Sequence, residues 1–355
     1  MIKLCPNCKR TTSTFIKGNN IPLVNNFKID KKLYNSDFYF CKNCDIGFLK
    51  YFHPDKKLYN KNYLYSGKFN KSKIDFILFV LKNEIKKDIS ILEVGGGDGY
   101  MGKLLGKNIN YTNIDPSSFK GFNTKKKFFE EYRINKKYDI VICLNVLAHV
   151  NYPDKIIKKI SSLLHKDSKI ILSVQNGLSQ IKSGYLDNIY HEHKYYYSAF
   201  SFRNKVSKIK NDLHYYKYPL HGESILATNI KLKLTKYKNF KSLIGKKEIK
   251  YAEKKYNKAL DTIKNKIYKS NLKVWGIGCA PRSLKLLYDL KEVSKKIVNI
   301  IEPKNSKKLN LKLPKQNIKI VQKNEALIGK KYTILWFPWH INPPKVFKNL
   351  IWPYN

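Results

Sequence analysis

Short apolar runs alternate with helix-like segments through the middle of this 355-residue chain. Four runs have the length and the apolar, β-branched composition of buried strands. They cover residues 89–94, 110–114, 138–144 and 169–174. Apolar residues recur at helical spacing from residue 71, at Ile74, Ile77, Leu78 and Leu81, and again from about 154 to 164. Strands that alternate with helices at this pace predict a parallel, doubly wound α/β sheet.

The same alternation returns near the C-terminus. A charged, helix-prone stretch at 246–269 is the predicted connector, and strands are predicted at 272–277, 296–301 and 332–337. Gly276 and Gly278 end the first of these strands, and a helical pattern follows them. We therefore expect an N-terminal module at 1–70, a central α/β domain at 71–245, and the connector with a smaller, Rossmann-like α/β domain at 246–355.

Four of the six cysteines form two CxxC pairs that bracket a 32-residue insert. They are Cys5, Cys8, Cys41 and Cys44. A two-residue gap lets both sulfurs of a pair face one ion, which is typical of tetrahedral zinc sites. Reduced surface thiols and a redox pair are the alternatives, and both explain the doubled spacing less well. A zinc ion would also supply stability that a 70-residue module lacks.

The composition restricts compartment and partners. No run of eighteen apolar residues exists and the N-terminus lacks a signal-peptide core, so we expect a cytoplasmic protein with no membrane span. The net charge is +44, but the lysines are spread along the whole chain, as a coding bias toward A/T-rich codons would produce. This pattern favours a solvated basic surface over a nucleic-acid site, and it attracts anionic small substrates. A monomer is expected.

A glycine-rich turn follows the strand at 89–94. Glycine tolerates positive φ and lets a ligand approach the backbone closely. The acidic Glu93 and Asp98 would repel a pyrophosphate but suit the amino-acid end of S-adenosylmethionine (SAM). An acid at the end of the next strand can bind ribose hydroxyls, and Asn145 ends the strand after that. The predicted cofactor-binding residues are Glu93, Gly95, Gly97, Asp98, Gly99, Asp115 and Asn145.

A polar string, Tyr190-His191-Glu192-His193, follows the strand at 169–174. His191 and His193 share one side only in a strand, so the spacing argues against a second metal site. Proton transfer is the favoured interpretation, because a histidine pKa near neutrality suits a general base. Packing of a polar loop is the alternative. A second polar group, at residues 221–224, is expected near the same pocket.

Motifs along nearly the whole chain carry a family resemblance. They are the four cysteines, residues 92–99, 114–117, 145–150, 189–193, 221–222 with Ser224, 276–278, and 334–339. The chain resembles the sugar C-methyltransferases that act on nucleotide-linked deoxy-keto-sugars. The Tyr-His-Glu-His string is the most specific element of this resemblance. It implies a class I methyltransferase domain between an N-terminal zinc module and a C-terminal Rossmann-like domain, with SAM and Zn²⁺ as cofactors.

The resemblance also implies roles for individual residues. His193 would be the general base, with Tyr190, His191 and Glu192 beside it, and Tyr63 or Tyr65 would close the site. A base next to a ketone can remove the adjacent carbon-bound proton, and the enolate then attacks the sulfonium methyl group. The product would enter a surface polysaccharide or glycoconjugate.

Two residues depart from the family pattern. Glu223 stands where a second glycine is expected, and Cys279 follows the C-terminal glycines. Either change is compatible with an altered sugar or carrier. O-methylation of a sugar or other small molecule stays open, since His193 could equally deprotonate a hydroxyl. A nucleic-acid binder or RNA methyltransferase is the alternative from a different class, although basic residues do not gather beside the cysteine pairs.

Overall fold

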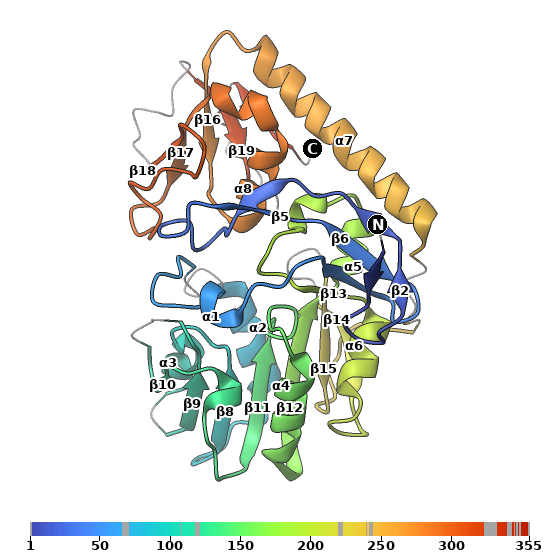
Figure 1. Cartoon of the computed structure of the whole chain (residues 1–355). Coiled ribbons are helices and arrows are strands. Elements are labelled where there is room, and N and C mark those ends of the chain that lie inside the picture. The colour runs from blue at the N-terminus through green and yellow to red at the C-terminus, as the bar shows by residue number, and fades with distance from the viewer. Residues whose placement is uncertain are drawn as a thin grey trace.

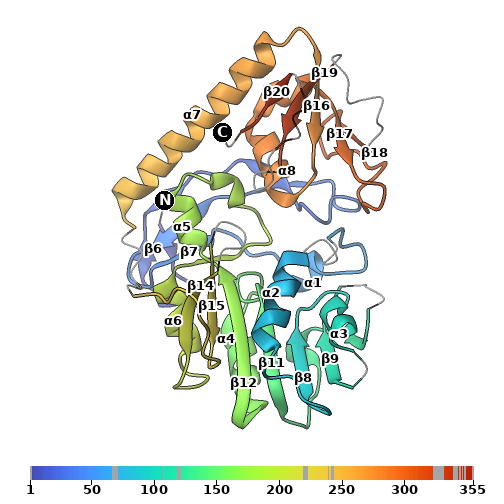
Figure 2. The same ribbon diagram turned by 180° about the vertical axis from the view of Figure 1, so that it is seen from behind.

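The computed structural model describes residues 2–65, 71–106, 108–117, 121–218, 223–238, 240, 244–322, 332–338 and 349–353, with 343, 345 and 347. Figures 1 and 2 show two α/β units with the N-terminal segment between them. A long helix runs along one side of the molecule, from the N-terminal segment to the C-terminal unit. Within these ranges, no helix combines the length and the hydropathy that crossing a bilayer requires.

The central unit is a seven-stranded sheet in the order β10-β9-β8-β11-β12-β15-β14. Its strands are β8 (Ser90–Val94), β9 (Asn110–Ile114), β10 (Thr124–Lys125), β11 (Tyr138–Leu144), β12 (Leu164–Gln175), β14 (His214–Tyr218) and β15 (Ser224–Thr228). The first five in this order are parallel, and β15 runs antiparallel between β12 and β14. All four strands predicted for this unit are present. β10, β14 and β15 were not predicted from the sequence; β10 has only two residues and β14 is rich in tyrosine.

Helices and turns connect these strands. They are α2 (Lys71–Leu81), α3 (Tyr100–Leu105), η2 (Phe129–Glu131), α4 (Pro153–Ser162), α5 (Gly177–Lys182), η3 (Leu186–Asn188) and α6 (Ala199–Val206). Helix α4 ends two residues before the predicted boundary, and β12 begins five residues before its own. The reason is that Leu164 already pairs with Tyr138 on β11. Apolar side chains pack on both faces of the sheet, as expected for a doubly wound unit.

The N-terminal segment consists of short strands and one helical turn. They are β1 (Lys3–Leu4), β2 (Thr11–Thr12), β3 (Phe15–Ile16), β4 (Asn20–Pro22), β5 (Leu33–Asn35), β6 (Phe38–Cys41), β7 (Ile46–Leu49) and α1 (Asp55–Leu58). Its four-stranded sheet has the order β13-β7-β6-β3, and β13 (Tyr195–Tyr197) comes from the central part of the chain. The N-terminal segment is therefore completed by residues that follow the Tyr-His-Glu-His string directly.

The C-terminal unit begins with α7 (Lys246–Lys269), which has the predicted bounds. It continues with β16 (Lys273–Ile277), α8 (Pro281–Asp289), η5 (Lys291–Lys296), β17 (Ile297–Glu302), β18 (Lys319–Gln322), β19 (Tyr332–Trp336) and β20 (Leu350–Ile351). All five strands are parallel, in the order β18-β17-β16-β19-β20. Its core is continuous with that of the N-terminal segment, because Phe38 and Tyr196 belong to the same apolar cluster as Leu284.

Candidate active site

The glycine loop joins β8 to α3 at the carboxyl edge of the central sheet. Gly95, Gly97 and Gly99 have φ values of +73°, +62° and +66°, in the region that favours glycine. β8 lies between β9 and β11, where the order of the parallel strands reverses, and open α/β sheets bind their ligands beyond the carboxyl ends of the strands at such a point. The loop thus has the backbone conformation and the position that a nucleoside cofactor requires.

Three acidic residues lie in or beside this loop. Glu93 is buried and accepts a hydrogen bond from the Tyr111 hydroxyl. Asp115, at the end of β9, accepts hydrogen bonds from the backbone N–H of Gly97 (2.9 Å) and of Ser117 (2.8 Å). Asp98 lies within the loop and accepts from the backbone of Tyr100 at 3.3 Å. The predicted acids therefore meet at one edge, and Asp115 holds the loop that it was expected to complement.

Asn145 begins the loop that follows β11, and its φ of +56° marks a sharp turn there. The next residue, Val146, packs so closely against Gly95 that a Cβ at this glycine would collide with it. Asn145 thus lies beside the glycine loop, as predicted. The loop then runs to Ala148, whose carbonyl accepts hydrogen bonds from the backbone of Lys194 (2.8 Å) and Tyr195 (3.2 Å). Backbone hydrogen bonds therefore join the loop after β11 to the residues that follow the Tyr-His-Glu-His string.

The Tyr-His-Glu-His string forms a tight turn, since the N–H of His193 donates to the carbonyl of Tyr190 at 3.0 Å. In such a turn the first and fourth side chains can face one another. The Tyr190 hydroxyl lies 3.0 Å from Nε2 of His193. Nδ1 of His193 lies 3.3 Å from the carbonyl of Asn188. A carbonyl only accepts, so the hydrogen belongs on Nδ1, and Nε2 is the acceptor and the basic atom.

Glu192 is enclosed by the N-terminal segment. Its carboxylate accepts hydrogen bonds from Nδ2 of Asn25 (2.9 and 3.1 Å) and from the Tyr63 hydroxyl (3.0 Å). Burial raises the pKa of Glu192 to about 7, although the hydrogen bonds from Tyr63 and Asn25 act in the opposite direction. A carboxyl with this pKa can hold or release a proton near neutral pH.

A second histidine lies beside the predicted base. The rings of His149 and His193 meet edge to face with centroids 4.9 Å apart, and Nδ1 of His149 lies 3.0 Å from the Tyr59 hydroxyl. His149 belongs to the 145–150 motif, but neither His149 nor Tyr59 was assigned a role from the sequence. Asn25 carried no signal at all. These three residues reach the site only through the fold.

His191 does not belong with the other residues of its string, contrary to the prediction that placed it beside His193. It occupies the second position of the turn. Its Nε2 lies 3.1 Å from the carbonyl of Asn35, and its ring packs against His53 at 5.1 Å. Burial lowers the pKa of His191 to about 3, so it stays neutral and serves packing.

Of the two candidate tyrosines, Tyr63 bonds to Glu192, whereas Tyr65 is 42% exposed and its ring lies 6.2 Å from that of Tyr63. Tyr63 therefore contacts Glu192 directly. His221, Gly222 and Trp339, all quoted for the resemblance, lie outside the described residues.

Glu223 adopts a φ of +93°, which explains why a glycine is expected at this position. Its carboxylate accepts hydrogen bonds from Nδ2 of Asn176 (2.5 Å) and from the Tyr237 hydroxyl (2.8 Å). Asn176 is the N-cap of α5, so the extra carboxylate is engaged in holding this helix start. Cys279 is buried, which raises the pKa of its thiol to about 12 and leaves it an unreactive packing residue.

The four paired cysteines come together. Their sulfurs all lie within 4.8 Å of one another, and those of Cys8 and Cys41 are 3.7 Å apart. Tetrahedral zinc with bonds of about 2.3 Å separates its sulfurs by about 3.8 Å, so these four fit the ion. Cys41 is the last residue of β6 and Cys44 lies in the turn from β6 to β7, and β7 pairs with β13.

Comparison with known families identifies the central domain. Residues 65–209 match the family described as "Methyltransferase domain". This range contains the glycine loop, Asp115, Asn145 and the Tyr-His-Glu-His string. The match places a methyltransferase-like domain in the central part of the chain.

Individual relatives are more distant. A stretch of 135 residues is 31% identical to an uncharacterized protein of Methanocaldococcus jannaschii, covering 36% of this chain and 57% of that protein. The plantazolicin methyltransferase BpumL has a similar structure at 17% identity, with a TM-score of 0.35 over 44% of this chain and 82% of its own. The N-methyltransferase NodS from Bradyrhizobium japonicum is 11% identical, with a TM-score of 0.34 over 45% of this chain and 95% of its own. TM-scores at this level carry no argument about the present chain.

Proposed function

We propose that this protein is a SAM-dependent methyltransferase that adds a methyl group to the carbon next to the keto group of a nucleotide-activated sugar. The observation that supports it best is the state of His193. Its Nδ1 hydrogen is directed to the Asn188 carbonyl, and its basic Nε2 faces the Tyr190 hydroxyl. A neutral histidine held in one tautomer is the group that abstraction of a carbon-bound proton needs.

SAM would be held by the glycine loop, with Asp115 available to the ribose hydroxyls and Glu93 and Asp98 supplying negative charge near its amino group. The residues present fit such a ligand, because three positive-φ glycines at alternate positions, Gly95, Gly97 and Gly99, leave the backbone open to close approach. When bound, SAM supplies the electrophilic methyl group that the substrate carbon takes up.

The residues of this chain would prepare that carbon. His193 Nε2 takes the proton from the carbon next to the ketone, and the electron pair moves to the keto oxygen. Once Nε2 carries that proton, the Tyr190 hydroxyl is released from it and can donate to the enolate oxygen, while the Tyr63 hydroxyl keeps its hydrogen bond to Glu192. Burial raises the pKa of both hydroxyls well above 10, so they remain protonated donors. Glu192 and His149 extend this network and can relay the proton away.

We further propose that Cys5, Cys8, Cys41 and Cys44 bind one zinc ion with a structural role. All four positions are taken by protein sulfur, which is the arrangement of closed structural sites. Because Cys41 ends β6 and Cys44 lies in the turn to β7, the ion would stiffen the strand that pairs with β13. The metal would thus support the segment that carries His193 without taking part in the reaction.

Deuterium wash-in tests the proposed chemistry. The protein is incubated in heavy water with nucleotide-linked keto-sugars, with and without SAM, and the sugars are analysed by mass spectrometry. We expect one exchanged position next to the ketone, gain of one carbon-bound methyl group with SAM, and loss of both in His193→Asn.

The matched control is His165→Asn. His165 pairs with Asp139 near the amino end of β12, away from the glycine loop, so exchange and methylation should persist in this variant. Methyl transfer without exchange would instead indicate an oxygen acceptor. No exchange and no transfer with any keto-sugar would refute the proposed substrate class.

A further inference from the structure

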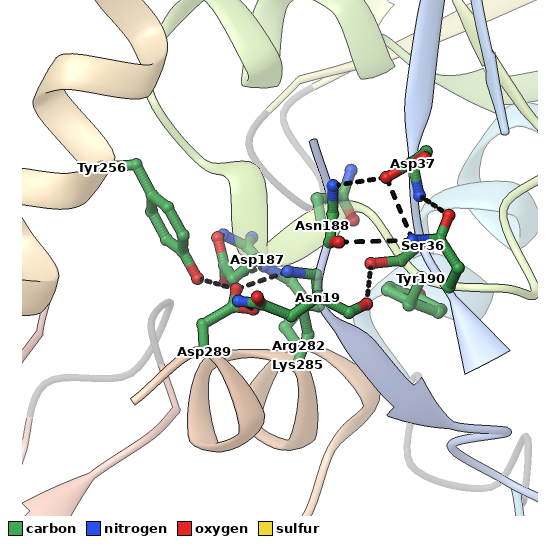
Figure 3. A network of polar contacts seen from close by, with 12 residues as sticks. Asn19, Ser36, Asp37, Asp187, Asn188, Tyr190, Tyr256, Arg282, Lys285 and Asp289 are labelled. Carbon is green, nitrogen blue, oxygen red and sulfur yellow. Dashed lines mark hydrogen bonds and ion pairs between the residues drawn. The ribbon is translucent and has the colours of Figure 1, made fainter. Parts of the chain in front are cut away.

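A buried ion pair joins the C-terminal unit to the catalytic segment. Arg282, in the first turn of α8, donates to both carboxylate oxygens of Asp187 in η3, from Nε at 2.7 Å and from Nη2 at 2.9 Å. The carboxylate of Asp187 is fully buried and Arg282 is 8% exposed. Figure 3 shows this pair between α8 and the segment that leads to Tyr190.

The same turn holds the general base. Asn188 directly follows Asp187, and its carbonyl accepts hydrogen bonds from Nδ1 of His193 (3.3 Å) and from the Tyr196 hydroxyl (3.1 Å). Nδ1 carries its hydrogen because this carbonyl is in place. A shift of η3 would remove the acceptor and allow the other tautomer, in which Nε2 carries the hydrogen and cannot take a proton.

This ion pair is better explained by the orientation that it imposes on η3 than by a contribution to the free energy of folding. Burying two charges roughly cancels their attraction, so an apolar pair of the same volume would hold two domains together as well. A planar guanidinium that bonds a carboxylate through two parallel N–H groups fixes both distance and orientation, which an apolar contact does not.

A second polar cluster on α8 contacts the N-terminal segment and α7. Asp289, at the end of α8, accepts hydrogen bonds from Asn19 of the N-terminal segment (2.8 Å) and from the Tyr256 hydroxyl of α7 (2.8 Å). Figure 3 shows this second cluster beside the first. Both clusters lie on α8. The Arg282 cluster binds η3, whereas the Asp289 cluster binds the N-terminal segment and α7.

We propose that Arg282 is a positioning residue for the catalytic base: through Asp187 and the Asn188 carbonyl, the C-terminal unit keeps His193 in the tautomer with a basic Nε2. This inference rests on the proposed function only in taking His193 as the base. It makes the C-terminal domain part of the catalytic apparatus, because removing its arginine disables a histidine about ninety residues earlier in the chain.

Steady-state kinetics provide the first test. Arg282→Met should lower kcat about 10- to 100-fold, part of the roughly 10²–10⁴-fold that a positioned general base contributes, with little change in either KM. Arg282→Lys keeps the charge but not the paired geometry and should recover part of this loss. Asn19→Ala removes the neighbouring contact to Asp289 and should leave kcat within about twofold of the original protein. An equal fall in Arg282→Met and Asn19→Ala would overturn the proposal, since any damage to the interface would then suffice.

The tautomer can be read without turnover. In protein labelled with ¹⁵N in its eight histidines, two-bond ¹H–¹⁵N correlations identify the protonated ring nitrogen, and His193→Asn assigns the signal. We expect Nδ1–H in the original protein and in Asn19→Ala, and a gain of Nε2–H in Arg282→Met. If Arg282→Met does not fold, as judged by circular dichroism, Asp187→Asn and Arg282→Lys take its place with the same expectation.

The outcomes separate the two proposals. An unchanged His193 tautomer in every folded variant of the pair would refute the role of Arg282, whatever the substrate is. A changed tautomer in a protein that exchanges and methylates no keto-sugar would refute the proposed function and leave the role of Arg282 supported.

Discussion

Glu192→Gln offers a test of the electrostatics of the site that does not require a substrate. Glu192 is 3% exposed, and its carboxylate is reached only by neutral donors, Asn25 and Tyr63, among its hydrogen-bond partners. Burial raises its pKa from an ordinary value of 4.5 to about 7. The folded protein therefore holds this proton more tightly than the unfolded chain does.

The sign and size of the effect follow from linkage. Below pH 4.5 the carboxyl is protonated in both states and its contribution to stability is complete. That contribution is lost as the pH rises from 4.5 to 7, because the folded state must then ionise a buried group. The interval of about 2.5 between the two pKa values corresponds, at about 1.4 kcal/mol for each unit, to about 3 kcal/mol in the free energy of unfolding.

Urea unfolding followed by far-UV circular dichroism at pH 5 and pH 8 measures this quantity. Glutamine has the same shape and no charge, so Glu192→Gln should lose most of this pH dependence and become more stable relative to the original protein as the pH rises. Glu292→Gln is the control, because this side chain is 76% exposed. If the stability difference between Glu192→Gln and the original protein is the same at both pH values, the proposed titration of Glu192 is wrong.

Three further changes test the loop, the segment and the metal. Gly95→Ala forces a side chain at φ +73° and against Val146, so it should cost about 1–3 kcal/mol and weaken SAM binding in calorimetry; normal affinity would argue against this loop as the site. Lys194→Met leaves Asp55 without its buried partner and should cost about 3–5 kcal/mol in urea unfolding. Adding Asp55→Asn should recover much of that loss, and no recovery would mean that the charge is not the cause. Cys41→Ser should abolish the one zinc per chain expected by inductively coupled plasma mass spectrometry, and retention of a full equivalent would refute the four-cysteine site.

The pattern of strands and helices was readable from the sequence because it depends on local periodicity. Residues 110–114, 138–144 and 246–269 form the predicted elements with the predicted bounds. Positive-φ glycines after β8 and the acid after β9 are likewise local features, which a parallel sheet necessarily brings to the same edge. The paired cysteines were predictable for the same reason, since two-residue spacing sets the geometry of each half-site.

Contacts between distant segments could not be predicted from the sequence. Nothing near Asn25 in the sequence shows that it meets Glu192, and the pairing of Arg282 with Asp187 spans 95 residues. The string at 190–193 was read as one group, but the turn it forms sends His191 toward Asn35 and His193 toward Tyr190. Residue types and local spacing thus specified the cofactor edge and the cysteine cluster. Which side chains surround the base depends on how three parts of the chain pack, and that packing is set by long-range burial that no short window of sequence contains.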